Sequence, residues 1–200
     1  MSNTATNPLA VLADIAHTQV GVHEEGENTG PQVIAYQRAT SEPGTGWPWC
    51  AAFVCWCVAQ LARMRPGLLS CEARKWMPTQ AGVRLLMDWA EDSGQLIQPV
   101  VDRGTARRMV GPSYPRGLQP QAGDIACMQF SEGRHIGIVS GPMQGDLVPT
   151  IEGNTSGPYH FKTDERNGGE VAAKLRPLGC ITHFIRLSVM AELVKGETTA

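Results

Sequence analysis

Residues 46–58 read GWPWCAAFVCWCV, and the most apolar run of the chain begins within this stretch. Pro48 suits the start of a helix, because a first-turn residue needs no hydrogen-bond donor. Apolar residues cover nearly all sides of the segment that follows, so we expect a buried helix over residues 49–63. Cys50 falls in its first turn, where unpaired backbone N–H groups and the helix dipole stabilise a thiolate. The stretch therefore predicts a core-anchored helix that presents a reactive sulfur toward solvent.

The same position also suits an unreactive cysteine at the top of a core helix. Cys55 and Cys57 lie deeper in the apolar stretch, where burial keeps a thiol protonated, and Cys127 and Cys180 also stand among apolar residues. We expect these four to be small core side chains. Cys50 differs from them because a helix start favours its ionised form, and the same N–H groups could stabilise an oxyanion.

Helical periodicity recurs on both sides of this stretch, and strand-like segments follow it. The spacing predicts helices over residues 7–20, 31–39 and 80–93. Short β-branched segments between Gly, Pro and Asn turns cover residues 124–130, 136–140, 147–152, 171–175 and 182–187. This order predicts an α+β fold in which N-terminal helices pack on a C-terminal antiparallel sheet. We expect one domain over residues 1–200, with a core from about 8 to 188 and a loose C-terminal tail.

Composition and charge narrow the classes of partner. The chain has 200 residues, a formal net charge of -2 and no run of Lys or Arg, which argues against a nucleic-acid partner. The first residues lack the regions of a secretory signal, and no apolar run is long enough to span a membrane. Six cysteines without a leader predict reduced thiols, and their spacing does not fit a zinc site. We expect a protein made in the cytoplasm, without a cofactor and without stable membrane association; the oligomeric state stays open.

A histidine lies at the mouth of the strand predicted within residues 133–141. Alternation places His135 and Gly137 on one face, and Gly137 leaves room for a backbone or a substrate to approach. On the next strand, Glu152 and Asn154 are two residues apart and are expected to project from the same side. Either could accept a hydrogen bond from the imidazole and leave its other nitrogen for the Cys50 thiol. A structural histidine and a solvent-facing turn are the alternatives.

At these residues the sequence resembles the CHAP family, cysteine- and histidine-dependent amidohydrolases and peptidases with a papain-like fold. The matching segments are residues 46–54, 123–126, 135–139 and 151–155, and residues 20–24 and 28–30 resemble the lead-in of bacterial and phage relatives. The resemblance implies Cys50 as nucleophile, His135 as base and Glu152 as the group that orients the imidazole. Asn154 would be an additional polar member, and the choice between Glu152 and Asn154 as the direct partner of His135 stays open.

Two departures from the family pattern limit what can be transferred. Papain-type enzymes place an oxyanion-hole glutamine shortly before the cysteine, whereas Thr45, Gly46 and Trp47 occupy that loop here. The second oxyanion donor is therefore unidentified. Some phage relatives carry an aspartate-rich calcium loop before the cysteine, and residues 41–45 lack those ligands, so we predict no metal.

The family's usual substrate is bacterial peptidoglycan, cut at the N-acetylmuramoyl–L-alanine amide or within the stem or bridge peptide. Trp47 and Trp49 flank the nucleophile and could line a groove for this ligand, or could pack in the core. A leaderless wall hydrolase would reach the wall or the periplasm as a released phage lysin or as an effector exported by a dedicated machine. The competing hypotheses are a thiol amidase for a small cytoplasmic peptide conjugate and a non-catalytic wall-binding module.

Overall fold

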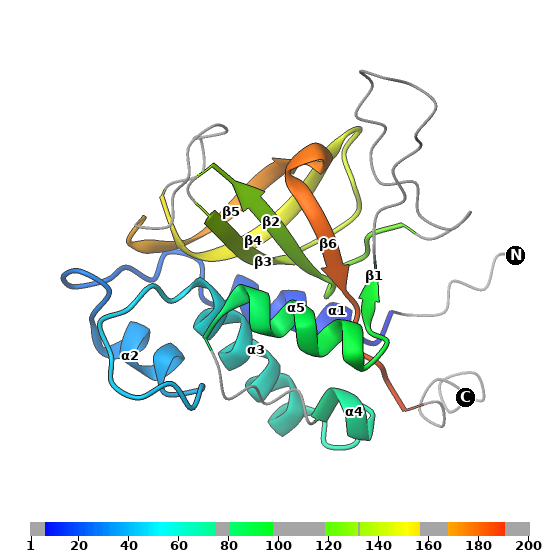
Figure 1. The fold of residues 1–200 in the computed structure, drawn as a ribbon, viewed down its shortest axis with the longest axis horizontal. Coiled ribbons are helices and arrows are strands. Elements are labelled where there is room, and N and C mark those ends of the chain that lie inside the picture. The colour runs from blue at the N-terminus through cyan, green and yellow to red at the C-terminus, as the bar shows by residue number, and fades with distance from the viewer. Residues whose placement is uncertain (1–6, 75–80, 98–118, 132, 157–167, 191–200) are drawn as a thin grey trace, which may run out of the picture.

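The structure is a computed structural model that describes residues 7–74, 81–97, 119–131, 133–156 and 168–190. Its helices gather on one side of a single sheet (Figure 1). The helices are α1 (Ala10–His17), α2 (Pro31–Gln37), α3 (Cys50–Met64), α4 (Cys71–Arg74) and α5 (Val83–Asp92). All five precede the main strands in the chain, so the predicted α+β, papain-like architecture is confirmed.

The sheet is antiparallel, with six strands in the order β1-β6-β2-β3-β4-β5. Their bounds are β1 (Leu96–Ile97), β2 (Ile125–Phe130), β3 (Gly133–Val139), β4 (Leu147–Thr155), β5 (Glu170–Pro177) and β6 (Ile181–Ile185), with a 3-10 turn η1 (Leu178–Cys180) before β6. Strands β2 to β5 are neighbours both in sequence and in the sheet, as expected for chains joined by short turns. The five predicted strand segments therefore correspond to β2 to β6.

Alternation along the strands produces two hydrophobic clusters on opposite faces of the sheet. The larger one joins the helices to the sheet, and Phe53 and Leu61 of α3 meet Ile136 and Ile151 there. The smaller one lies on the other face and is formed by Ala126, Met128, Val139, Val148, Ile181 and Phe184. Helix α3 is thus enclosed by the larger core, which explains why its sequence is apolar nearly all round.

The predicted boundaries differ from the observed ones mainly at the ends of elements. Helix α1 begins at Ala10, because Asn7 closes a turn before it: its side-chain oxygen accepts the Leu9 N–H at 3.1 Å. The helix ends at His17, so Val20, the last residue of the predicted helix, lies beyond it and is 41% exposed. The prediction of one domain stays a prediction, and most of its loose tail lies outside the described residues.

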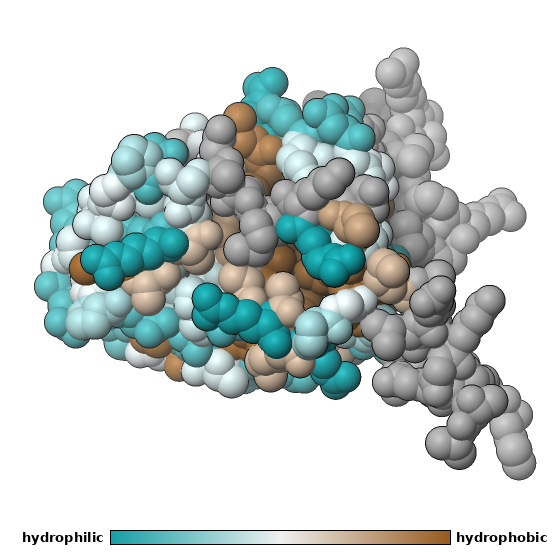
Figure 2. All heavy atoms as spheres, turned by 90° about the horizontal axis from the view of Figure 1, so that it is seen from below, coloured by the Kyte–Doolittle hydropathy of each residue, from teal (hydrophilic) through white to brown (hydrophobic). Residues whose placement is uncertain are grey.

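The outer surface of the helical side is largely hydrophilic, with small apolar areas between polar side chains (Figure 2). Three large hydrophobic side chains within the described ranges are exposed, namely Val20, Met64 and Leu85. Among the described helices, none combines the length and the apolar character that crossing a bilayer requires.

Candidate active site

Cys50 is the first residue of α3, as the position of Pro48 predicted. No described side chain caps this helix start, and the N–H groups of a first turn have no partner within the helix. The sulfur therefore lies at the positive end of the helix dipole. Cys50 is only 7% exposed, so the expectation that it faces solvent openly is wrong. It still differs from Cys55 and Cys57, which are fully buried in the same helix.

The loop before Cys50 is held by a buried glutamine that the sequence reasoning did not identify. The amide nitrogen of Gln37 donates to the carbonyl oxygen of Trp47 at 2.7 Å and to that of Asn28 at 3.2 Å. Its side-chain oxygen accepts the Gly46 N–H at 3.3 Å. Gln37 is completely buried on α2, so these bonds fix the path of the chain into the nucleophile.

Trp49, a candidate for the substrate groove with core packing as the alternative, belongs to the core. It is completely buried and stacks on Tyr36, with ring centroids 5.6 Å apart. Its indole N–H donates to Glu24 Oε2 at 3.2 Å. The groove role is therefore wrong for Trp49, because a completely buried side chain offers no surface to a substrate. Trp47 is half-buried against the same core and remains a candidate for contact with substrate.

His135 lies on β3, and its ring is held by Glu152 of β4. The distance from His135 Nε2 to Glu152 Oε2 is 2.9 Å, and both side chains are almost completely buried. A carboxylate only accepts hydrogen bonds, so Nε2 carries the hydrogen. The question left open by the sequence is thereby answered: Glu152 is the direct partner of His135.

The second ring nitrogen of His135, Nδ1, is buried and not engaged by Glu152. Among the described residues Nδ1 has no hydrogen-bond partner, whereas the Cys50 side chain helps to raise the pKa of the ring by a hydrogen bond and by its charge. Hydrogen bonds between reacting groups are often long or poorly aligned before substrate binds. The structure therefore brings Cys50, His135 and Glu152 together in that order.

The His135 imidazole has an unusual affinity for a proton. Burial by itself lowers its pKa, but hydrogen bonds to Cys50 and Glu152, together with the charges of both groups, raise the pKa from 6.5 to about 10. In the same way, burial raises the pKa of Glu152, but Arg176 and His135 outweigh it and hold that pKa well below its ordinary range. Both shifts favour the charged forms, an imidazolium beside an ionised carboxylate.

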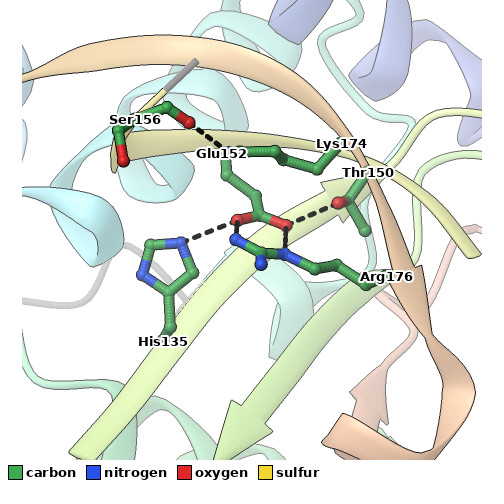
Figure 3. Close-up of polar contacts among 6 residues, drawn as sticks. All are labelled: His135, Thr150, Glu152, Ser156, Lys174 and Arg176. Atoms are coloured by element: carbon green, nitrogen blue, oxygen red, sulfur yellow. Dashed lines mark hydrogen bonds and ion pairs between the residues drawn. The ribbon is translucent and has the colours of Figure 1, made fainter. Parts of the chain in front are cut away.

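The Glu152 carboxylate has more partners than the sequence suggested (Figure 3). Its Oε1 accepts from Thr150 Oγ1 at 2.6 Å and from Arg176 Nε at 2.8 Å. Its Oε2 accepts from Arg176 Nη2 at 2.6 Å as well as from His135. Figure 3 shows the carboxylate between the imidazole and the guanidinium. Thr150 and Arg176 were missed because alternating polar residues on a strand equally indicate a solvent-facing edge.

Two glycines let these groups approach. A Cβ atom on Gly137 would lie 2.5 Å from Glu152 Cγ, so the space that we assigned to a backbone or a substrate is filled by the Glu152 side chain. A Cβ atom on Gly153 would lie 2.7 Å from side-chain atoms of both Phe53 and Trp49. Strand β4 can therefore pack directly against the first turns of α3, which brings Glu152 close to the nucleophile.

Asn154 is buried in β4 beyond Glu152. The pairing of β4 with β5 shifts register between Glu152 and Thr155, and Asn154 has a φ of 57°. Asparagine is one of the few non-glycine residues that adopt this conformation readily. The strict alternation that placed Glu152 and Asn154 on one side therefore ends at Glu152.

The remaining cysteines and candidate ligands give no sign of a second reactive centre. Burial and the Cys50 charge raise the pKa of Cys55 to about 12, and burial raises that of Cys127 to about 12 as well. Cys180 is partly exposed rather than a core residue, which corrects our expectation. In the described part of the chain, no three His, Cys, Asp or Glu side chains form a group that could hold a metal.

An α+β fold of papain type, with a thiol at a helix start beside a strand histidine, defines a class of amide- and peptide-bond hydrolases. Residues 42–154 match the family model of the CHAP domain. This match covers more than half of the chain, from before Cys50 through Asn154. The chain therefore belongs to the CHAP family, a family of amidase and peptidase domains that act on peptidoglycan. No curated protein matches the chain significantly.

Proposed function

We propose that this protein is a cysteine-dependent peptidoglycan hydrolase that cleaves an amide or peptide bond by acyl transfer. The observation that carries the proposal is the order Cys50, His135, Glu152: the imidazole is bonded at 2.9 Å to a buried carboxylate, and the Cys50 side chain also helps to raise its pKa. In this proposal the whole chain works as one catalytic domain.

The chemistry follows from the protonation state of the imidazole. The Cys50 thiolate attacks the carbonyl carbon of the scissile amide, and the first-turn N–H groups of α3 stabilise the oxyanion. The C–N bond then breaks while His135 gives its proton to the leaving amine, which leaves a thioester on Cys50. Neutral His135 takes a proton from water, the resulting hydroxide attacks the thioester, and the C–S bond breaks. The products are a free carboxyl group and the original thiolate–imidazolium pair.

Purified bacterial sacculi provide the direct test. Wild-type protein should release soluble muropeptides, and Cys50→Ala and His135→Ala should abolish release, because each removes one partner of the acyl transfer. Cys71→Ser is the matched control, since Cys71 is an exposed cysteine on α4 outside the site. Mass spectrometry of the new termini should identify the scissile bond.

The same assay separates the competing functions. Intact sacculi together with hydrolysis of soluble γ-glutamyl amides would replace the proposal by an amidase for small conjugates. If the protein binds sacculi without releasing muropeptides, and Cys50→Ala binds equally well, the proposed hydrolase would be replaced by a wall-binding module. Wild-type turnover in either the Cys50 or the His135 variant would remove the cysteine mechanism altogether.

In this proposal the protein acts at the wall or in the periplasm. It would reach its substrate by release through a membrane lesion or by dedicated export. Expression in a Gram-negative host tests this. A version fused to a periplasmic signal should lyse the cells, and the same fusion with Cys50→Ala should not. Equal toxicity of the unfused chain in the cytoplasm would contradict a wall substrate.

A further inference from the structure

Among the residues that the structure describes, Arg176 is the most deeply buried lysine or arginine, and the mechanism above does not use it. It lies on β5, outside the residues that match the family model, and is 2% exposed. Its guanidinium contacts both carboxylate oxygens of Glu152, at 2.8 Å through Nε and at 2.6 Å through Nη2. A two-point contact of this kind fixes the plane of a carboxylate as well as its charge.

Phe130, at the end of β2, covers this pair. The Arg176 guanidinium lies 5.4 Å from the centre of the Phe130 ring, and the same ring lies 6.4 Å from the His135 ring. An aromatic face is a favourable neighbour for a guanidinium cation. Imidazole, carboxylate and guanidinium are thus held together in a buried environment, where charge interactions are stronger than in water.

The charged and titratable groups around Glu152 come from several elements. His135 faces it from β3, Arg176 and the buried Lys174 share its side of the sheet on β5, and Cys180 interacts with it from η1. Lys174 directs its ammonium to the carbonyl oxygen of Ser156. Arg176 is thus the cation bonded to the carboxylate, and His135 is its second partner.

We propose that Arg176 is a positioning residue for the acyl transfer: by holding both oxygens of Glu152, it orients the acceptor of His135 Nε2–H and so keeps Nδ1 directed at the Cys50 sulfur. The inference rests on the proposed function, because it assigns Arg176 a part in preparing the thiol–imidazole pair. A guanidinium that merely neutralised a buried carboxylate could be replaced by the ammonium of a lysine without changing the reactivity of Cys50.

Loss of the Arg176 side chain should change the pH dependence of Cys50 reactivity. The Arg176 hydrogen bond is the first of the influences that lower the pKa of Glu152, against the effect of burial. In Arg176→Met the carboxyl should therefore take up a proton at higher pH than in the wild type. A protonated Glu152 no longer stabilises the imidazolium. The acidic limb of the pH–rate profile, where Cys50 loses its reactivity as the pH falls, should therefore move toward neutral pH.

The test is the rate of iodoacetamide alkylation of Cys50, located by peptide mapping, from about pH 4 to about pH 9 in folded wild type, Arg176→Met and Arg176→Lys. Near pH 6 we expect Arg176→Met to react about tenfold or more slowly than wild type, which corresponds to at least one unit of pKa. Arg176→Lys should be intermediate, because an ammonium keeps the charge but not the two-point contact. A wild-type acidic limb in Arg176→Met would overturn the proposal.

Folding and the proposed function are checked separately. If Arg176→Met does not fold, Arg176→Lys decides: its acidic limb must lie at higher pH than that of wild type, and an unshifted limb overturns the proposal. If wild-type Cys50 reacts no faster than the exposed Cys71, the cysteine mechanism itself fails. Fast wild-type labelling with unshifted variants removes only the role of Arg176.

Discussion

Gly137 of β3 and Glu152 of β4 fit together so closely that a Cβ atom on the glycine would lie 2.5 Å from Glu152 Cγ. The absence of a side chain at Gly137 is what allows the carboxylate to reach His135. Gly137 and Glu152 thus pack directly against each other on adjacent strands, and the Glu152 side chain fills the space beside the glycine.

Gly137→Ala should disturb this packing. Overpacking of this kind costs about 1–3 kcal/mol in free energy of unfolding, and displacement of Glu152 should lower the rate of sacculus hydrolysis. Gly141→Ala is the matched control, because its Cβ atom would meet only Pro149 at an ordinary 3.9 Å. Urea unfolding and muropeptide release measure the two effects. Equal behaviour of the two alanine variants would contradict the close fit.

Glu152→Gln should lower the affinity of His135 for its proton. The hydrogen bond and the charge of Glu152 both help to raise the pKa of His135 to about 10, against the effect of burial. A neutral amide supplies no charge, so His135 should titrate at clearly lower pH in the variant. NMR titration of the histidine ring signals measures this, with the exposed His17 on α1 as internal control. An unchanged His135 titration would show that Glu152 does not set its protonation.

The same buried pair predicts how stability depends on pH. His135 has a raised pKa, so its contribution is complete below 6.5 and is lost as the pH rises through about 10. Glu152 has a lowered pKa, so its contribution is present above 4.5 and is lost as the pH falls toward its folded-state value. Both contributions to stability are complete between pH 4.5 and pH 6.5.

Urea unfolding as a function of pH measures this profile. Buried thiols such as Cys127 also make the folded protein less stable at alkaline pH, because they ionise more readily in the unfolded chain. The informative quantity is therefore the difference between wild type and His135→Gln. That difference should shrink as the pH approaches about 10. A difference that stays constant over the alkaline range would contradict the raised pKa.

Trp49→Phe should affect stability and leave substrate affinity unchanged. The substitution removes the bond from the indole to Glu24, and a hydrogen bond to a charged group contributes about 1.5–3 kcal/mol. Since Trp49 is completely buried, it cannot contact a ligand. KM for a soluble muropeptide should therefore equal that of the wild type, whereas Trp47→Ala should raise it. A raised KM in Trp49→Phe would restore the groove role that the structure removes.

The sequence was sufficient to predict the elements that carry strong local signals. Pro48 and the apolar run behind it located α3 to within one residue, and β-branched segments located five of the strands. The contact of His135 with Glu152 followed from strand alternation, although the sequence could not distinguish Glu152 from Asn154. The register shift after Glu152 decided between them, and such a shift depends on the neighbouring strand.

Interactions between segments that lie far apart in the chain could not be predicted from the sequence. Arg176 lies 24 residues after Glu152, and a lone arginine on a strand carries no sign of its partner. Gln37 supports the nucleophile loop from α2, and a glutamine in a short helix is equally compatible with a surface position. The low exposure of Cys50 also depends on packing around the helix start, which periodicity within α3 does not describe.

The most direct test of the central claim is competitive alkylation of the native protein with iodoacetamide at neutral pH, followed by peptide mapping of all six cysteines. If the start of α3 and His135 together activate Cys50, this partly covered sulfur should be modified faster than the exposed Cys71, and His135→Ala should remove the advantage. Labelling of Cys50 that is slower than that of Cys71, or that is unaffected by loss of the imidazole, would contradict the account.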